Sequence, residues 1–190
     1  MTDADPPARF EALVLPHLDA AYNLARWLTR NDSDAEDVVQ DACLRAIRYL
    51  GGFRGDQPRP WLLQIVRNTC WSWLRENRPA EVVAIDDIEE SLRDGPAPSA
   101  DEPLATALRK ADRLRINQAL GALPIPFREV LVLRELEDLS YRDIARIADI
   151  PVGTVMSRLA RARALMRLAL APSARPLLRT VPRVVQGAVK

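Results

Sequence analysis

Residues 139–163 read LSYRDIARIADIPVGTVMSRLARAR, and this stretch decides the fold of the C-terminal part of the chain. Apolar side chains recur at helical spacing before and after a short segment, 149–153, that contains a proline and a glycine. The pattern predicts a helix over 140–148, a tight turn, and a longer helix over 152–169 that Thr154 caps. A short helix, a tight turn and a longer basic helix form the helix-turn-helix arrangement of many DNA-binding proteins.

The second of these helices carries its arginines on one side. An α-helix turns by about 100° per residue, which places an apolar stripe inward and leaves small residues between arginines outside, with Ala160 among them. Guanidinium groups bind phosphates or form two hydrogen bonds with one guanine, and hydroxyl groups can bind phosphates or base edges. An exposed arginine is more often plain solvated surface, but the turn, the spacing and the basic charge of the region favour duplex DNA. The predicted duplex contacts are Arg142, Arg146, Thr154, Ser157, Arg158, Arg161 and Arg163.

The charge of the chain changes in three steps. Residues 1–79 carry a net charge of −1, residues 80–108 of −7 and residues 109–190 of +9. The acidic middle is also rich in proline, a composition that buries too little apolar area to offset its ordering entropy. We therefore predict an all-α fold of two small helical domains with a flexible join. The predicted bounds are 1–79 for the first domain, 80–107 for the acidic linker, 108–170 for the second domain and 171–190 for a basic tail.

Three helical patterns occur in the first domain. One runs over 10–28 and contains Pro16, which should interrupt it. The second follows Asn31-Asp32-Ser33, a natural N-cap cluster, and ends before the glycines at 51–52. The third runs over 60–77. In the second domain the pattern predicts helices over 105–121, 125–136, 140–148 and 152–169.

The composition excludes several classes of function. One histidine, no glycine-rich phosphate loop and no cluster at metal-ligand spacing leave nothing to perform catalysis, so we predict neither an enzyme nor a bound cofactor or metal. Cys43 and Cys70 fall among apolar residues in helical patterns and are predicted to be small buried side chains. The acidic N-terminus differs from a signal peptide, and no apolar run nears the roughly 18 residues of a membrane span. These features predict a cytoplasmic protein.

Several segments resemble one family. Residues 139–145 and 150–159, with REVLVLR at 128–134, are similar to region 4 of the group IV, or extracytoplasmic-function (ECF), sigma factors. The segment DAEDVVQD at 34–41 and the FRG at 53–55 resemble region 2 of the same family. The resemblance implies a factor that binds the β′ and β subunits of core RNA polymerase and directs it to promoters under the control of an anti-sigma factor.

The resemblance also assigns roles in the first domain. It implies that the region 2 helix docks on β′ through Asp37, Gln40, Asp41 and Arg45. It implies that a basic face with aromatic side chains holds the melted −10 strand, since bases stack on aromatic rings. Trp71 is the best stacking candidate, whereas Trp61 and Trp73 are expected in the core. The implied −10 contacts are Arg54, Arg59, Gln64, Arg67, Asn68, Trp71, Arg75 and Arg78.

Two other functions compete with a sigma factor. A sigma-like decoy would sequester an anti-sigma factor without reading DNA, but the basic face after the turn argues against it. A plain helix-turn-helix transcriptional regulator would leave the first domain without a purpose.

Overall fold

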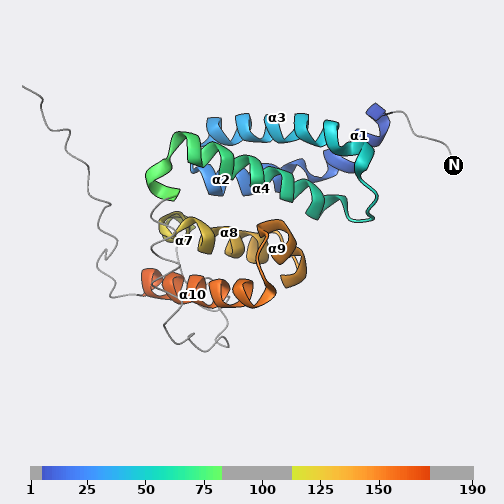
Figure 1. Ribbon diagram of the computed structural model, residues 1–190. Coiled ribbons are helices and arrows are strands. Elements are labelled where there is room, and N and C mark those ends of the chain that lie inside the picture. The colour runs from blue at the N-terminus through green and yellow to red at the C-terminus, as the bar shows by residue number, and fades with distance from the viewer. Residues whose placement is uncertain (1–5, 83–112, 172–190) are drawn as a thin grey trace, which may run out of the picture.

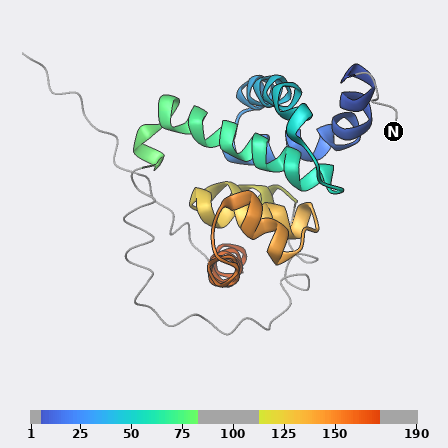
Figure 2. The ribbon, with the colours of Figure 1, turned by 45° about the vertical axis from the view of Figure 1, so that its right-hand side comes forward.

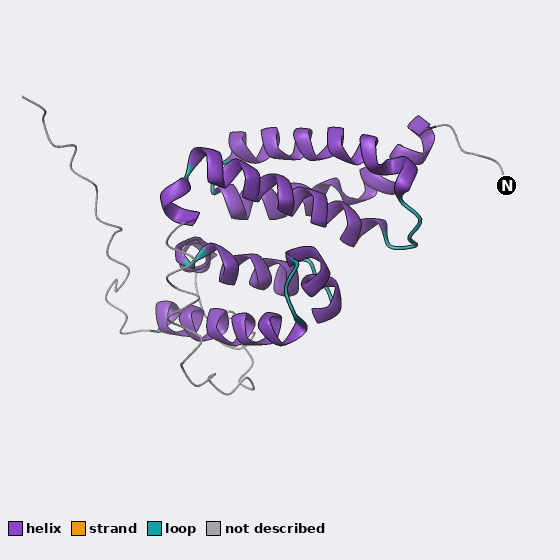
Figure 3. Cartoon of the chain, in the orientation of Figure 1, coloured by secondary structure: helices purple, strands orange, loops and turns teal. Residues whose placement is uncertain are grey.

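The structure is a computed structural model that describes residues 6–82 and 113–171. Every regular element in these two ranges is helical, and none is a strand (Figure 3). The helices form two domains, one from each range, which confirms the all-α prediction. Most of the predicted linker and nearly all of the predicted basic tail lie outside the described residues.

Three long helices pack on one another to form the first domain. They are α2 (Leu18–Thr29), α3 (Asp32–Tyr49) and α4 (Pro58–Asn77). Full burial of one large apolar side chain stabilises a fold by about 1.5–3 kcal/mol, so the leucines between these helices hold the bundle together. The largest of these fully buried side chains are Leu24, Leu28, Leu62, Leu63 and Leu74.

The chain enters this bundle through α1 (Pro6–Val14) and a 3-10 turn, η1 (Leu15–His17). Pro16 lies in η1, where its missing N–H and its ring interrupt the regular α-helix. The predicted interruption at this residue is therefore confirmed.

The turn between α2 and α3 is set by two consecutive residues. Arg30 ends α2 in the left-handed region, with φ at 59°. Asn31 then caps α3, its side-chain oxygen accepting a hydrogen bond from the backbone N–H of Asp34 at 3.0 Å. The cap therefore falls within the predicted cluster 31–33, and α3 begins at Asp32, two residues earlier than predicted. At its other end α3 runs into a 3-10 turn, η2 (Leu50–Gly52).

Four α-helices and one π-helical turn form the described part of the second domain. They are α7 (Arg113–Ala122), α8 (Ile125–Leu131), the π-turn η3 (Val132–Leu136), α9 (Tyr141–Ala148) and α10 (Val152–Leu170). The predicted helix over 105–121 is confirmed from residue 113, while 105–112 lies outside the described residues. The helix predicted over 125–136 is α-helical only in its first half and widens into the π-turn.

The α9 and α10 helices form the predicted helix-turn-helix. Ser140 caps α9 by accepting a hydrogen bond from the Asp143 N–H at 3.1 Å, and Asp149 ends it at a φ of 55°. The predicted start of α10 at residue 152 is confirmed, but the prediction that Thr154 caps it is wrong, because Pro151 holds the N-cap position. Proline presets a backbone angle compatible with helix entry. The N–H of Thr154 then bonds the carbonyl of this proline at 2.9 Å.

The helices of the two domains lie in four layers (Figures 1 and 2). On one side α3 is outermost, next come α2 and α4, then α7, α8 and α9, and α10 lies on the opposite side. Contacts between the domains join α4 to α9, and α2 to α8 and η3. Most of the buried apolar side chains of both domains belong to one continuous cluster. The structure therefore shows the two domains packed together, with α3 and α10 facing away from each other.

Candidate nucleic-acid and polymerase interfaces

The surface of α10 carries most of the side chains predicted to contact duplex DNA. Thr154, Ser157 and Arg161 are half-buried, and the Ser157 hydroxyl donates to the Thr154 carbonyl at 3.0 Å. The expectation that Ala160 faces outward is wrong, since it is only 8 % exposed. The buried stripe is wider than the sequence pattern indicates because α10 packs against α7, α8 and α9 together.

The remaining predicted duplex contacts on these two helices differ widely in exposure. Arg142 is exposed, and Arg163 donates to Glu135 at 2.8 Å. Arg158 is buried, and burial together with the positive charge of Arg67 lowers the pKa of Arg158 to about 10. In this conformation Arg158 lies inside the molecule rather than on a DNA-facing surface.

The basic face of α4 is directed into the second domain. The Nε of Arg67 and the Nε1 of Trp71 both donate to the same carboxylate oxygen of Glu129, each at 2.8 Å. The Arg67 guanidinium also lies over the Trp71 ring, 4.9 Å from its centroid. Two side chains predicted to bind the −10 strand therefore converge on one carboxylate of α8.

A second carboxylate, from the loop after η3, receives another predicted −10 contact. Arg59 donates to the backbone carbonyl of Glu137 at 2.8 Å and to its side chain at 2.5 Å. The other side-chain oxygen of Glu137 accepts from the amide of Asn23 on α2 at 2.5 Å. This carboxylate thus joins the second domain to two elements of the first.

A third set of contacts involves α9, the first helix of the helix-turn-helix. Gln64 donates to the backbone carbonyl of Arg146 at 3.2 Å, and the Arg146 guanidinium donates to Gln57 at 2.9 Å and to Asp143 at 2.6 Å. A predicted −10 residue and a predicted −35 residue are therefore in contact with each other.

The other predicted −10 residues lie outside this interface. Arg54, Asn68 and Arg75 are exposed. Arg78 pairs with Asp34 at 3.5 Å and lies over the Trp73 ring. Trp61 and Trp73 are partly buried against the core, as predicted, and Trp61 lies 4.7 Å from the Phe53 ring, centroid to centroid.

Sequence reasoning missed the two interface carboxylates. Glu129 has no exposed surface and Glu137 has only 5 %. One signal was present: Glu129 and its neighbour Arg128 interrupt the apolar run 125–133, and buried charges are rarely tolerated without partners. The periodicity shows that these charges are on a packed helix, but not which side chains of the first domain meet them.

The exposed side of α3 carries the residues predicted to bind polymerase. Asp37 and Gln40 are exposed, and Asp41 pairs with Arg45 at 2.9 Å. Large apolar side chains that the sequence reasoning did not select are exposed on the same helix, namely Leu44 (51 %), Ile47 (51 %) and Tyr49 (59 %). Leu44 and Ile47 lie one turn apart on this helix, and exposed apolar side chains beside charged groups are typical of a protein-binding surface.

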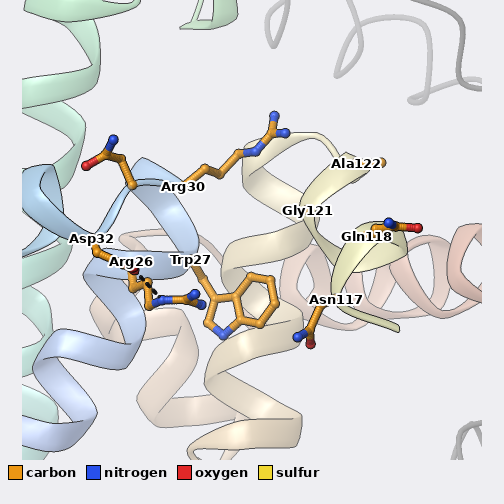
Figure 4. A pocket seen from close by; sticks show the side chains of 9 residues that line it. Arg26, Trp27, Arg30, Asp32, Asn117, Gln118, Gly121 and Ala122 are labelled. Carbon is orange, nitrogen blue, oxygen red and sulfur yellow. Dashed lines mark hydrogen bonds and ion pairs between the residues drawn. The ribbon is translucent and has the colours of Figure 1, made fainter. Parts of the chain in front are cut away.

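An open, polar cleft of about 550 Å³ lies between the end of α2 and α7 (Figure 4). Arg26, Trp27 and Arg30 line it from the first domain, and Asn117 and Gln118 from the second. It is a surface cleft across the domain boundary and holds no catalytic arrangement.

Within residues 6–82 and 113–171 no group of three or more acidic, histidine or cysteine side chains is placed to hold a metal ion. Cys70 is buried, as predicted, and Cys43 is half-buried. Burial raises the pKa of both thiols, which disfavours the reactive thiolate form. No helix in these ranges has the length and apolar character needed to cross a membrane.

A helix-turn-helix with a basic outer helix, coupled to a helical domain with an arginine- and tryptophan-bearing face, defines a DNA-binding transcription protein. Comparison with known families identifies the family within this class. The model of Sigma-70 region 2 matches residues 13–79, and that of Sigma-70, region 4 matches residues 113–166. The chain belongs to the ECF sigma factors of the sigma-70 family. Members of this family are transcription initiation factors and not enzymes.

Individual relatives match most of the chain. The RNA polymerase sigma-H factor of Pseudomonas aeruginosa is 37 % identical over 86 % of this chain and 86 % of its own length. The ECF RNA polymerase sigma-E factor of Haemophilus influenzae is 37 % identical, over 78 % and 80 %. That of Escherichia coli is 40 % identical, over 68 % and 70 %.

Solved structures share the fold. The sigma factor RpoE of Bartonella quintana, in complex with the anti-sigma factor NepR, superposes with a TM-score of 0.63 and 25 % identity, covering 87 % of this chain and 98 % of that one. CnrH, in complex with the cytosolic domain of CnrY, superposes with a TM-score of 0.59 and 27 % identity, covering 86 % and 87 %.

Proposed function

We propose that this chain is a sigma factor that acts in the cytoplasm, binds core RNA polymerase and directs it to a specific set of promoters. The observation that carries the proposal is the presence, in order, of a region 2 domain and a region 4 domain whose helix-turn-helix bears a basic outer surface. The domain bounds we assign are 1–79 for region 2 and 108–170 for region 4. A plain helix-turn-helix regulator would not need the region 2 domain.

The polymerase contact is assigned to the exposed side of α3. Asp37, Gln40 and Asp41 offer acceptors to a basic partner surface, and Leu44 adds an exposed apolar side chain beside them. Arg45, paired with Asp41, limits the freedom of that carboxylate and so orients it. The expected docking surface is the β′ subunit of core polymerase.

The −10 strand is assigned to the face of α4 and to the loop before it. Arg59, Arg67 and Arg75 supply charge for the phosphates, while Trp71 supplies a ring on which a base can stack. Stacking on an aromatic side chain contributes roughly 1–3 kcal/mol per base, which a paired base cannot gain without leaving the duplex. This difference favours a melted strand over a duplex.

The −35 duplex is assigned to the helix-turn-helix. The first turns of the second helix of this motif, from Thr154 to Arg161, are the part that reaches base edges in the major groove. We assign the contacts to backbone phosphates beside the groove to Arg142 and Arg146 on α9. The β subunit is the expected polymerase contact of this domain.

Control by an anti-sigma factor is the expected regulation. RpoE and CnrH, to which the fold of this chain is similar, were solved in complex with NepR and with the cytosolic domain of CnrY. The polar cleft between α2 and α7 gives such a partner simultaneous access to both domains.

Footprinting of the polymerase–promoter complex tests this division of the DNA. Wild-type chain with core polymerase should protect the −35 duplex and make thymines near −10 reactive to permanganate. Arg161→Ala should reduce the −35 protection, and Arg67→Ala should reduce the −10 reactivity. Arg30→Ala, an exposed arginine at the end of α2, is the matched control and should do neither. A wild-type footprint on only one of the two elements would contradict the proposal.

A further inference from the structure

The interface between the two domains uses the side chains proposed to hold the −10 strand. Arg67 and Trp71 donate hydrogen bonds to the carboxylate of Glu129, and Arg59 donates one to the carboxylate of Glu137. The present inference rests on the proposed function, because it takes these residues to be strand contacts. A carboxylate offers the same chemistry as a phosphate: a negative charge and oxygen acceptors for arginine.

The contact between Glu129 and Arg67 is buried. Glu129 has no exposed surface, and the Arg67 side chain that reaches it is only 16 % exposed. A buried carboxylate is unfavourable unless it is paired and hydrogen-bonded, and here donors from the first domain provide the pairing. When the domains separate, water can solvate both the carboxylates and the arginines. Such a contact can therefore open without unfolding either domain.

We propose that Glu129 and Glu137 form an intramolecular latch that holds the second domain over the −10-binding face of the first. The latch and the melted strand compete for Arg59, Arg67 and Trp71, so the free chain is closed to the strand until the latch opens. Because α9 lies in the same interface, with Arg146 bound to Gln57, closure also engages part of the helix-turn-helix.

The polymerase-binding side is arranged differently. The α3 helix lies on the side of the first domain that faces away from the second (Figure 1). Its exposed residues are therefore available while the latch is closed. The latch covers the proposed DNA-binding residues and leaves the proposed polymerase contact exposed. Polymerase can therefore bind before the two domains separate.

The test compares the full chain with the double variant Glu129→Gln and Glu137→Gln, which removes both charges and keeps the side-chain shapes. Asp138→Asn is the matched control, since it removes the adjacent carboxylate, whose side chain is 96 % exposed. X-ray scattering measures the radius of gyration, and fluorescence anisotropy measures binding of a single-stranded oligonucleotide with the non-template −10 sequence of a promoter found by run-off transcription. Circular dichroism verifies that each variant is folded.

The latch predicts a larger radius of gyration for the double variant than for the wild type or the control. It also predicts at least about tenfold tighter strand binding, as expected if the wild type is open in no more than about a tenth of molecules. An unchanged radius of gyration overturns the latch, and an increased radius without tighter binding overturns the competition. If loss of Glu129 unfolds the second domain, Glu137→Gln alone, at the edge of the interface, provides the same comparison.

Arg67→Ala separates failure of the latch from failure of the proposed function. It breaks the same contact and should open the chain, but it should bind the strand more weakly than the open double variant does, because Arg67 is itself a proposed strand contact. If Arg67→Ala opens the chain and binds the strand as tightly as the double variant does, the −10 assignment is wrong and the latch stands. If it leaves the chain closed and weakens strand binding, the latch is wrong and the −10 assignment stands.

Discussion

Substitution of Arg128 by methionine gives a sharp test of how the second domain fixes the ends of neighbouring helices. Arg128 is 2 % exposed, and its guanidinium donates to the Trp27 carbonyl of α2 and to the Leu123 carbonyl after α7, both at 2.8 Å. These carbonyls lie at or just beyond the C-terminal ends of helices, where the last carbonyls lack intrahelical partners. Arg128 therefore supplies hydrogen bonds that the helices themselves cannot.

The expected loss in the free energy of unfolding follows from those two hydrogen bonds. A hydrogen bond from a charged donor contributes about 1.5–3 kcal/mol, so the pair contributes about 3–6 kcal/mol. Burial lowers the pKa of Arg128 to about 10, which shows that the fold holds this charge at some cost and reduces the net effect. We expect Arg128→Met, which keeps most of the apolar volume, to lower the free energy of unfolding by about 2–4 kcal/mol.

Urea unfolding followed by circular dichroism measures this loss. Arg142→Met is the matched control, because Arg142 is an exposed arginine of the same domain. The control should change the free energy of unfolding by no more than about 0.5 kcal/mol. If Arg128→Met is no more destabilising than Arg142→Met, the two carbonyl contacts do not stabilise the fold.

Four further results are expected. Asn31→Ala removes the N-cap of α3 and should lower the free energy of unfolding by about 1 kcal/mol in the same urea assay, whereas a neutral result would deny the cap its role. Arg161→Ala should weaken binding of holoenzyme to a −35 duplex by about 1–3 kcal/mol in a salt titration, and unchanged affinity would remove it from the DNA surface. Asp41→Ala should weaken binding to core polymerase, measured by fluorescence titration, and an unaltered dissociation constant would count against the α3 assignment. The pKa of His17 is lowered by burial and by the nearby charge of Arg59, so the unfolded state binds its proton more readily. Acidification below about pH 6.5 should therefore destabilise the wild type more than His17→Gln, and equal losses in the two would show that His17 is not responsible.

The elements defined by local chemistry could be predicted from the sequence. Asn31 caps α3 and Pro16 interrupts the first helical segment because both effects depend only on the backbone nearby. The helix-turn-helix follows from the apolar spacing around a turn. The start of α10 at residue 152 could be predicted from the turn, but its cap could not, because Thr154 is a good N-cap residue and Pro151 holds that position instead.

The interface between the domains could not be predicted in this way. Glu129 and Arg67 are far apart in the sequence, and no periodic pattern relates two helices joined by a long acidic segment. For the same reason the exposure of Arg158 was misjudged. A stripe of arginines is predicted to be exposed when only its own helix is considered, but Arg158 of that stripe is buried in the folded chain.

Run-off transcription with purified core polymerase, this chain and fragments of the source genome tests the central claim most directly. A sigma factor of this kind should yield transcripts that core polymerase alone does not make, from templates that share two sequence elements, one near −35 and one near −10. Absence of such transcripts together with absence of binding to core polymerase would contradict it.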